Sequence, residues 1–329
     1  MKLQIALMLL LTGVLLINTS FAVENKTLER LGNEAAASGD SLFTDHKFTE
    51  AAQKYEEAHK LFVRAEEEDN IPLSDKINQM LSNMVASYYQ AEDYENTIRI
   101  LKIRLEHEPN NDIYARQISQ IYEGLLNNSE KAAEVLIEFA KNNENFTVYR
   151  TIARLHNEME KINEAINWYE KSFNIRQDPD VLQSIALLHH RLGNTKEAIK
   201  SYERFLETNP REAVLISVYR NMGRFYDDIG NNEKSIEFFE RSNQLRFNRD
   251  ITLLLLTKYF DKGDYTKARQ KANLLLEDNP SNADAIYYTG IIFFEQEKYS
   301  EAKEQFMRIT GDRRYGNAAK QYIESIDSM

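Results

Sequence analysis

The sequence predicts an all-α protein built from an array of helix-turn-helix hairpins. The first observation is residues 192–210, where a glycine and a polar pair form a turn, Ala198 and Tyr202 share one helix face, and a proline ends the helix. The second is that this pattern recurs at residues 263–280 and 92–109, and such self-similarity indicates a repeat array. The third is composition: 42% hydrophobic residues, 28% charged residues and 5 prolines favour a folded helical chain over a disordered one.

From about Leu28 onward the pattern resembles tetratricopeptide repeats. The resemblance is carried by a small residue that opens the second helix of each hairpin, by an aromatic residue one turn later, and by a small residue in the first helix. The opening residue, which we call the marker, falls at Ala51, Thr97, Ala133, Ala165, Ala198, Ser235, Ala268 and Ala302. Most spacings are close to the family period of about 34 residues. The resemblance therefore implies a right-handed α-solenoid of about eight hairpins over residues 32–309.

Each part of the hairpin has a packing reason. Antiparallel helices that approach closely need a small residue where they cross, and we expect this role at Gly39, Ala153, Ala186, Gly223 and Gly290. One turn later, larger residues would fill the wedge between neighbouring hairpins. These are Tyr88, Tyr122, Tyr226, Tyr259 and Phe293, with His156 and His189 at the same position of their repeats.

Three segments depart from the regular pattern. The first marker interval is long, and residues 60–70 contain an acidic run, which predicts an extended second helix with a solvated acidic tip. The third hairpin is the weakest match because its turn, residues 125–128, carries extra residues. At the end, residues 315–327 place Ala319 and Tyr322 on one helix face, which predicts the capping helix that such arrays need.

The start of the sequence is typical of a secretory signal peptide. Met1 and Lys2 precede an apolar run, residues 3–17, and small residues lead up to Ala22. We expect cleavage after Ala22, which leaves residues 23–329 as one solenoid domain without a stable membrane anchor. The alternative is an uncleaved anchor, but the run is shorter than the roughly 20 residues of a membrane span. The chain has no cysteine for a disulfide or a lipid. A periplasmic location in a diderm bacterium is therefore expected, with secretion as the alternative.

Charge and motif content argue against several functions. A net charge of -11 and a pI near 5.2 disfavour a nucleic-acid partner, because phosphate neutralisation needs a basic face. The 6 histidines are scattered and none forms a zinc-binding motif with a neighbouring glutamate. No glycine-rich phosphate loop or nucleophile elbow is present. The sequence therefore predicts neither an enzyme nor a bound metal or cofactor.

The resemblance implies that the first helices line a concave groove. The residues it places there are Arg116, Gln120, Arg150, Arg154, Gln183, His190, Arg220, Asn221 and Arg224. The candidate partner-binding residues among them are Arg116, Arg150, Arg154, Arg220, Asn221 and Arg224. Two interpretations are open for these arginines: internal ion pairs with Glu123, Glu158, Asp227 or Asp228, or an acidic peptide or terminal carboxylate held by the guanidinium groups. The ordered Lys, Asn and Arg set with which some family members hold a C-terminal carboxylate is absent.

The last two hairpins carry apolar residues on the same face: Leu253, Leu254, Phe260, Tyr287, Tyr288, Ile291 and Phe294. An exposed apolar patch of this extent would serve docking or self-association. Packing against the capping helix is the alternative.

Together these features predict a non-catalytic scaffold or adaptor of the bacterial cell envelope that binds a partner protein or an acidic peptide in its groove. The alternative is a periplasmic chaperone-like protein that engages many extended peptides transiently. A scaffold should copurify with one partner at fixed stoichiometry, whereas a chaperone should return a heterogeneous set.

Overall fold

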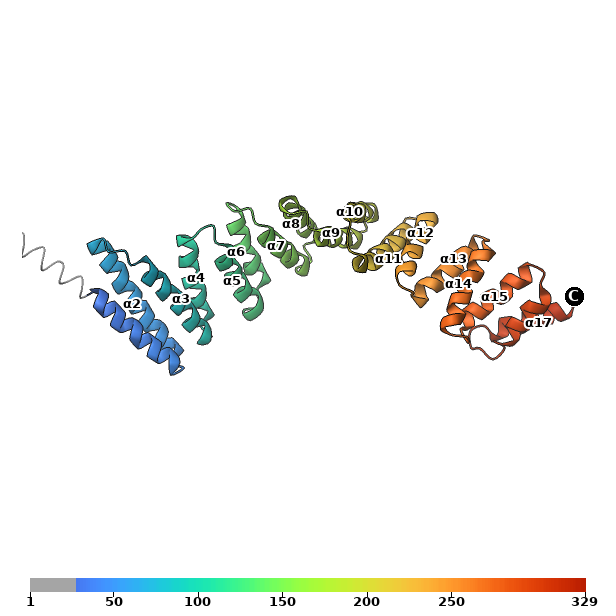
Figure 1. Ribbon diagram of the computed structural model, residues 1–329, viewed down its shortest axis with the longest axis horizontal. Helices are drawn as coiled ribbons and strands as arrows, with labels where there is room; N and C mark the ends of the chain where they lie inside the picture. The colour runs from blue at the N-terminus through green and yellow to red at the C-terminus, as the bar shows by residue number, and fades with distance from the viewer. Residues whose placement is uncertain (1–27) are drawn as a thin grey trace, which may run out of the picture. The chain divides into compact units, whose positions relative to one another are not determined.

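The computed structural model describes residues 28–329, and these residues form helices and turns without a strand (Figure 1). The predicted signal peptide, residues 1–22, lies outside the described residues. The chain separates into two compact units, with the boundary between Trp168 and Tyr169. That residues 23–329 form a single domain therefore remains a prediction.

Eight helical hairpins follow one another in the described residues. In the first, a helix over residues 28–44 precedes α2 (Phe48–Asp69). The next pairs are α3 (Ser74–Gln90) with α4 (Tyr94–His107), α5 (Asp112–Gln120) and the π-helical turn η1 (Ile121–Leu125) with α6 (Ser129–Ala140), and α7 (Phe146–Glu158) with α8 (Ile162–Ile175). The last pairs are α9 (Pro179–Arg191) with α10 (Thr195–Glu207), α11 (Glu212–Asp228) with α12 (Asn232–Leu245), α13 (Arg249–Asp261) with α14 (Tyr265–Asp278), and α15 (Ala283–Glu295) with α16 (Tyr299–Met307). The predicted all-α solenoid of hairpins is confirmed.

The turn inside each hairpin uses one residue with a left-handed backbone, two positions before the second helix begins. Only three of these residues are glycines, although a positive φ favours glycine because it has no Cβ. The eight are His46, Glu92, Asn127, Glu160, Gly193, Gly230, Gly263 and Glu297. The turn geometry is thus shared by hairpins whose sequences give no glycine signal.

The marker residues lie in the first turn of each second helix, on its buried side. In seven of the eight hairpins the marker donates its backbone N–H to the carbonyl of the residue that precedes the helix, as Ala198 does to Asn194. In the third hairpin the residue that makes this bond is Ala132, to Asn128, so the assignment of Ala133 was wrong by one position. Two adjacent alanines are indistinguishable by size, and only the backbone bond separates them.

The extra length of the third hairpin lies before its turn, not in it. Residues 121–125 form η1, and a single π-type turn inserts one residue into an otherwise α-helical segment. The predicted insertion at residues 125–128 is therefore corrected to the helix that precedes them.

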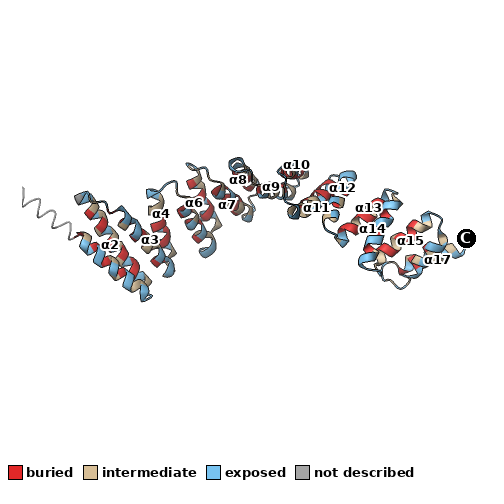
Figure 2. Ribbon diagram, viewed as in Figure 1, coloured by how far each residue is buried: buried red, intermediate tan, exposed pale blue. Residues whose placement is uncertain are grey.

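Close approach of the paired helices is confirmed at the predicted glycines of the first helices. A Cβ built at Gly39, Gly223 or Gly290 would lie 2.7 Å from an aromatic carbon of the second helix. Those carbons belong to Tyr55, Phe239 and Phe306, each one turn after the marker of its hairpin. Figure 2 shows the result, with the buried residues on the sides of the helices that face their neighbours.

The extended second helix with an acidic tip is also confirmed. Helix α2 has 22 residues and ends at Asp69, where Asn70 adopts a left-handed backbone. Glu67 and Glu68 are exposed, whereas Glu66 accepts hydrogen bonds from the Leu73 N–H at 2.9 Å and the Ser74 hydroxyl. The tip is therefore solvated, with one carboxylate fixing the chain that follows.

A final helix, α17 (Gly316–Asp327), packs on the last hairpin where the sequence predicts a cap. Its Ala319 is fully buried and its Tyr322 ring stacks on Phe306, with centroids 4.7 Å apart. Tyr287 and Phe294, two residues of the predicted apolar patch, pack in the same cluster. Capping thus covers part of the surface that could otherwise serve docking.

Candidate functional site

Arg154 is committed to contacts within the protein. Its guanidinium donates to both carboxylate oxygens of Glu123, at 2.6 and 2.7 Å, and to Glu158 at 2.7 Å. The hydrogen bonds from Arg154 hold the pKa of Glu123 below its usual value, and those to Glu123 and Glu158 raise the pKa of Arg154. Glu123 lies on η1 and Arg154 on α7, so this fork joins two consecutive hairpins.

Two further candidates also have partners inside the molecule. Arg116 donates to Asp112, one turn earlier on α5, at 2.7 Å. The amide of Asn221 donates to the buried Tyr202 hydroxyl at 2.9 Å, which ties α11 to α10. For these residues, as for Arg154, the geometry matches internal pairing.

Arg150, Arg220 and Arg224 are exposed and have no charged partner within residues 28–329. Arg220 and Arg224 lie one turn apart on α11, so their side chains leave the same face of the helix. Of the acidic residues nearest to them in sequence, Asp227 pairs with Lys258, and a carboxylate oxygen of Asp228 lies 3.8 Å from the Nδ1 of His190. We call Arg220 and Arg224 the arginine pair.

The predicted partner-binding residues are divided between the two units. Arg116, Arg150 and Arg154 belong to the first unit, and Asn221 and the arginine pair belong to the second. Gln183 and His190, also in the second unit, are half-buried, and the His190 ring packs on Phe225 with centroids 4.3 Å apart. Each unit therefore holds its own set of candidates.

Of the two histidines at the wedge positions, His156 is a core residue and His189 is half-buried. His156 is buried, and neither of its ring nitrogens has a hydrogen-bond partner in the described structure. Burial lowers the pKa of His156, and it lowers that of His59 on α2. Across residues 28–329 no group of three His, Cys, Asp or Glu side chains is arranged to hold a metal ion.

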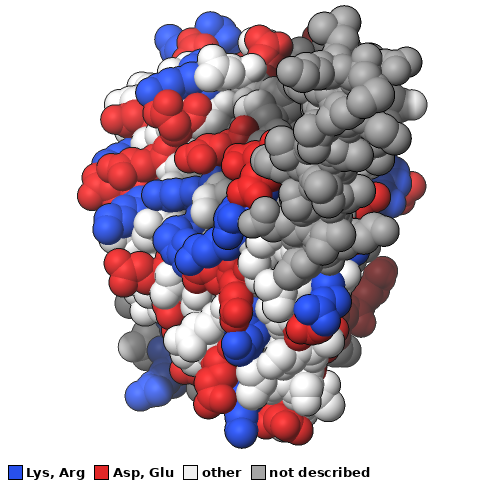
Figure 3. All heavy atoms as spheres, turned by 90° about the vertical axis from the view of Figure 1, so that its left-hand side faces the viewer, with Lys and Arg blue, Asp and Glu red and all other residues white. Residues whose placement is uncertain are grey.

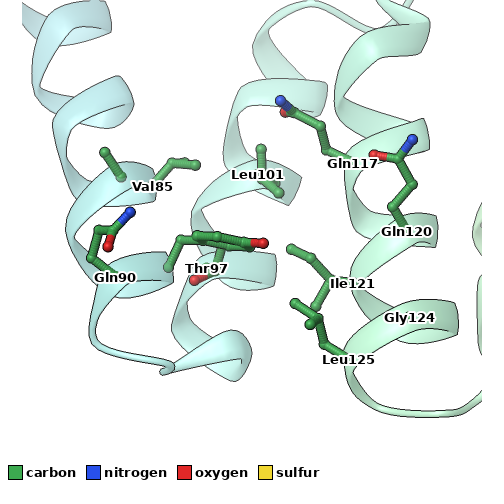
Figure 4. Close-up of a pocket in the computed structure, with 11 residues that line it drawn as sticks. Val85, Gln90, Thr97, Leu101, Gln117, Gln120, Ile121, Gly124 and Leu125 are labelled. Atoms are coloured by element: carbon green, nitrogen blue, oxygen red, sulfur yellow. The ribbon is translucent and has the colours of Figure 1, made fainter.

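A pocket of about 600 Å³ lies between α3, α4 and α5 with η1 (Figure 4). Its lining, which we call the amide pocket, consists of Val85, Ala86, Tyr89, Gln90, Thr97, Leu101, Gln117, Gln120, Ile121, Gly124 and Leu125. None of these side chains carries a charge. Of them only Gln120 is among the residues expected in the groove, and Thr97 is the marker of its hairpin.

The amide pocket has apolar groups that water still reaches. Tyr89 on α3 is 45% exposed and Leu125 on η1 is 39% exposed. In Figure 4, Gln117, Ile121 and Leu125 extend from α5 and η1 toward α4, and Gln90 lies at the end of α3 on the opposite side. The sequence signal that could have located it is Gly124 inside a helix, because a helical glycine is costly without a local reason.

Charge is not segregated on the part of the surface shown in Figure 3. Lysine and arginine side chains there lie next to aspartates and glutamates. Within the described residues no helix is both long and apolar enough to span a bilayer.

Comparison with protein-family models identifies the class to which this fold belongs. Two tetratricopeptide-repeat models match, one over residues 253–319 and the other over 147–179, 179–212 and 216–249. The chain is therefore a tetratricopeptide-repeat protein. Comparison with curated protein sequences finds no match.

Solved structures of repeat proteins are similar in fold. The crystal structure of YrrB, described as a TPR protein with an unusual peptide-binding site, is 17% identical, with 57% of this chain and 99% of that one covered and a TM-score of 0.44. A tetratricopeptide repeat protein from Parabacteroides merdae is 16% identical, with coverages of 76% and 98% and a TM-score of 0.41. A chain of the Naa15/Naa10 complex bound to HypK-THB gives 13% identity, coverages of 76% and 38%, and a TM-score of 0.54.

Proposed function

We propose that this protein is a non-catalytic adaptor of the bacterial cell envelope that binds a partner protein, or an acidic peptide segment of one, on the face formed by its first helices. Tetratricopeptide repeats generally mediate protein–protein interactions, and their stacked first helices form extended binding surfaces. The observation that carries the acidic partner is the arginine pair. Two exposed guanidiniums one turn apart repel each other weakly, and an anionic ligand would remove that repulsion.

The envelope location rests on the signal-peptide pattern of residues 1–22 and on the absence of cysteine from the chain. Mass measurement of the protein extracted from the cell envelope tests it. We expect a chain that begins at Val23 in the periplasmic fraction. A chain that retains Met1 and sediments with membranes would contradict the proposal, and a mature chain in the medium would favour secretion.

The arginine pair is tested by replacing Arg220 and Arg224 together with alanine. Because neither has an ion-pair partner to lose, the melting temperature should stay equal or rise slightly. Capture of the partner, crosslinked in native envelopes and identified by mass spectrometry, should fall, and the remaining binding should depend less on salt.

Arg154→Ala is the matched comparison, since it removes an arginine that does have partners. It leaves Glu123 without its bidentate donor and should lower the melting temperature, while the folded fraction captures the partner normally. If the double variant captures the partner as well as the wild type does, the arginine pair is not the binding site.

The same crosslinking experiment separates the adaptor from the chaperone-like alternative. One partner at fixed stoichiometry supports the adaptor. A heterogeneous set of unfolded chains supports the chaperone, and self-association through the apolar residues of the last hairpins would appear as crosslinks between copies of this chain.

A further inference from the structure

We infer that the amide pocket binds an extended, uncharged peptide segment that places one apolar side chain between Tyr89 and Leu125. This inference rests on the proposed function, because it assigns a second and chemically different contact to the same kind of partner. The arginine pair would take acidic residues of the partner, and the amide pocket would take a neutral stretch.

Within the described part of the chain the three glutamine amides of the pocket are unused, whereas the Thr97 hydroxyl donates to the Asp93 carbonyl. Gln90, Gln117 and Gln120 are exposed, and their amides have no hydrogen-bond partner in residues 28–329. A glutamine amide offers two N–H donors and a carbonyl acceptor, which is the same set that a peptide group needs. Gln117 and Gln120 lie one turn apart on α5, so both are available to one extended backbone.

The absence of charge selects the ligand. A carboxylate or ammonium group that entered the pocket would lose water without gaining a counterion from its lining. A neutral peptide has no such cost, because its N–H and C=O groups can pair with the glutamines. An apolar side chain gains as well, because Tyr89 and Leu125 are 45% and 39% exposed when the pocket is empty.

Gly124 lines the pocket and adds no side chain to it. A Cβ built there meets no atom within 4 Å, so the helix does not need glycine for internal packing. The φ of Gly124 is not positive, so other residues fit the backbone. A larger side chain at this position would therefore enter the space without displacing the core.

Selection from two displayed peptide libraries tests the inference on the full mature chain. The first library contains Ser, Gln, Asn and Gly with one Leu, and the second has Glu in place of Gln. The most enriched sequence is then synthesised with acetylated and amidated ends, and its Kd is measured by fluorescence anisotropy. We expect enrichment from the neutral library, with a Kd that changes less than about twofold between low and physiological salt.

Two variants place the bound peptide. Gly124→Leu fills the pocket and Gln117→Glu adds a charge of nearly the same shape, and each should weaken binding at least about tenfold. Gly311→Leu and Gln270→Glu, the latter at an exposed position of the second helix α14, are the matched controls in the second unit, and they should leave the Kd unchanged. Circular dichroism melts check that each variant folds. If Gly124→Leu does not fold, Gln117→Glu alone still tests the site.

The failure of this inference is distinguishable from failure of the proposed function. Enrichment of acidic peptides alone, lost on replacing the arginine pair but not on Gly124→Leu, would overturn the amide pocket and support the adaptor. Neutral peptides that bind all four variants equally would overturn the pocket as their site. Enrichment from neither library would also overturn it, while partner capture by crosslinking would still test the adaptor.

Discussion

Arg154 and Arg224 occupy equivalent positions in their hairpins but have different surroundings. Arg154 meets Glu123 of the preceding hairpin, whereas the position equivalent to Glu123 in the hairpin before Arg224 holds His189. A carboxylate can accept two hydrogen bonds from one guanidinium, and an imidazole cannot replace it in that role. The residue that the preceding hairpin supplies is therefore one difference between the two arginines. A second is that Arg154 also donates to Glu158 one turn later, whereas Arg224 makes no ion pair with the aspartate at the equivalent position of the described structure.

His156 should make the stability of the protein sensitive to acid. Burial lowers its pKa in the folded chain below the unfolded value of about 6.5, so the unfolded chain binds the proton more readily. The free energy of unfolding should therefore be unaffected by the titration of this histidine above about pH 6.5, and it should decrease as the pH falls below that value. His156→Phe should flatten this loss, because it removes the titrating group and its two unpaired nitrogens.

Urea unfolding at several pH values measures this effect. At pH 8 the imidazole is neutral in both states, so any difference between the variant and the wild type there reports the unpaired nitrogens and the packing, not titration. Between pH 7 and pH 5 the free energy of unfolding should fall less in the variant. Equal slopes in the two proteins would show that His156 does not carry the effect.

The turn of each hairpin contains one left-handed residue, and we expect opposite effects on stability from removing a glycine there and from introducing one. Gly193 has a φ of 75° and Glu297 a φ of 59° at equivalent positions, and a Cβ at Gly193 would meet nothing within 4 Å. Gly193→Ala should therefore lower the free energy of unfolding by about 1 kcal/mol for backbone reasons alone. Glu297→Gly should raise the free energy of unfolding, because glycine adopts the left-handed backbone without strain. The gain should be smaller than about 1 kcal/mol, because the glycine also makes the unfolded chain more flexible.

Thermal melts of the two variants and of the double variant check the assignment. The sites lie in different hairpins and share no contact, so their effects should add. A stabilising Gly193→Ala would show that the turn does not keep its left-handed residue in solution.

At the scale of the whole molecule, each hairpin contacts mainly its neighbours, so damage should stay local. Tyr322→Ala removes the ring that stacks on Phe306 and should lower hydrogen-exchange protection in α15 and α16. Helix α2, in the other unit, should keep its protection. Phe62→Ala, in the core beside Gly32, should instead lower hydrogen-exchange protection in α2 and leave that of α15 and α16 unchanged. Loss of protection throughout the chain in either variant would instead mean that the array unfolds as one cooperative unit.

The sequence by itself determined the hairpins, their order and the final helix, because small, aromatic and turn-forming residues act on neighbours within one repeat. It could not determine which arginines are free, since the carboxylate that binds Arg154 comes from another hairpin, 31 residues away. It also could not show the amide pocket, whose walls come from three helices and one π-turn. Long polar side chains reach several partners, and only the packed arrangement of neighbouring hairpins decides which of them they meet.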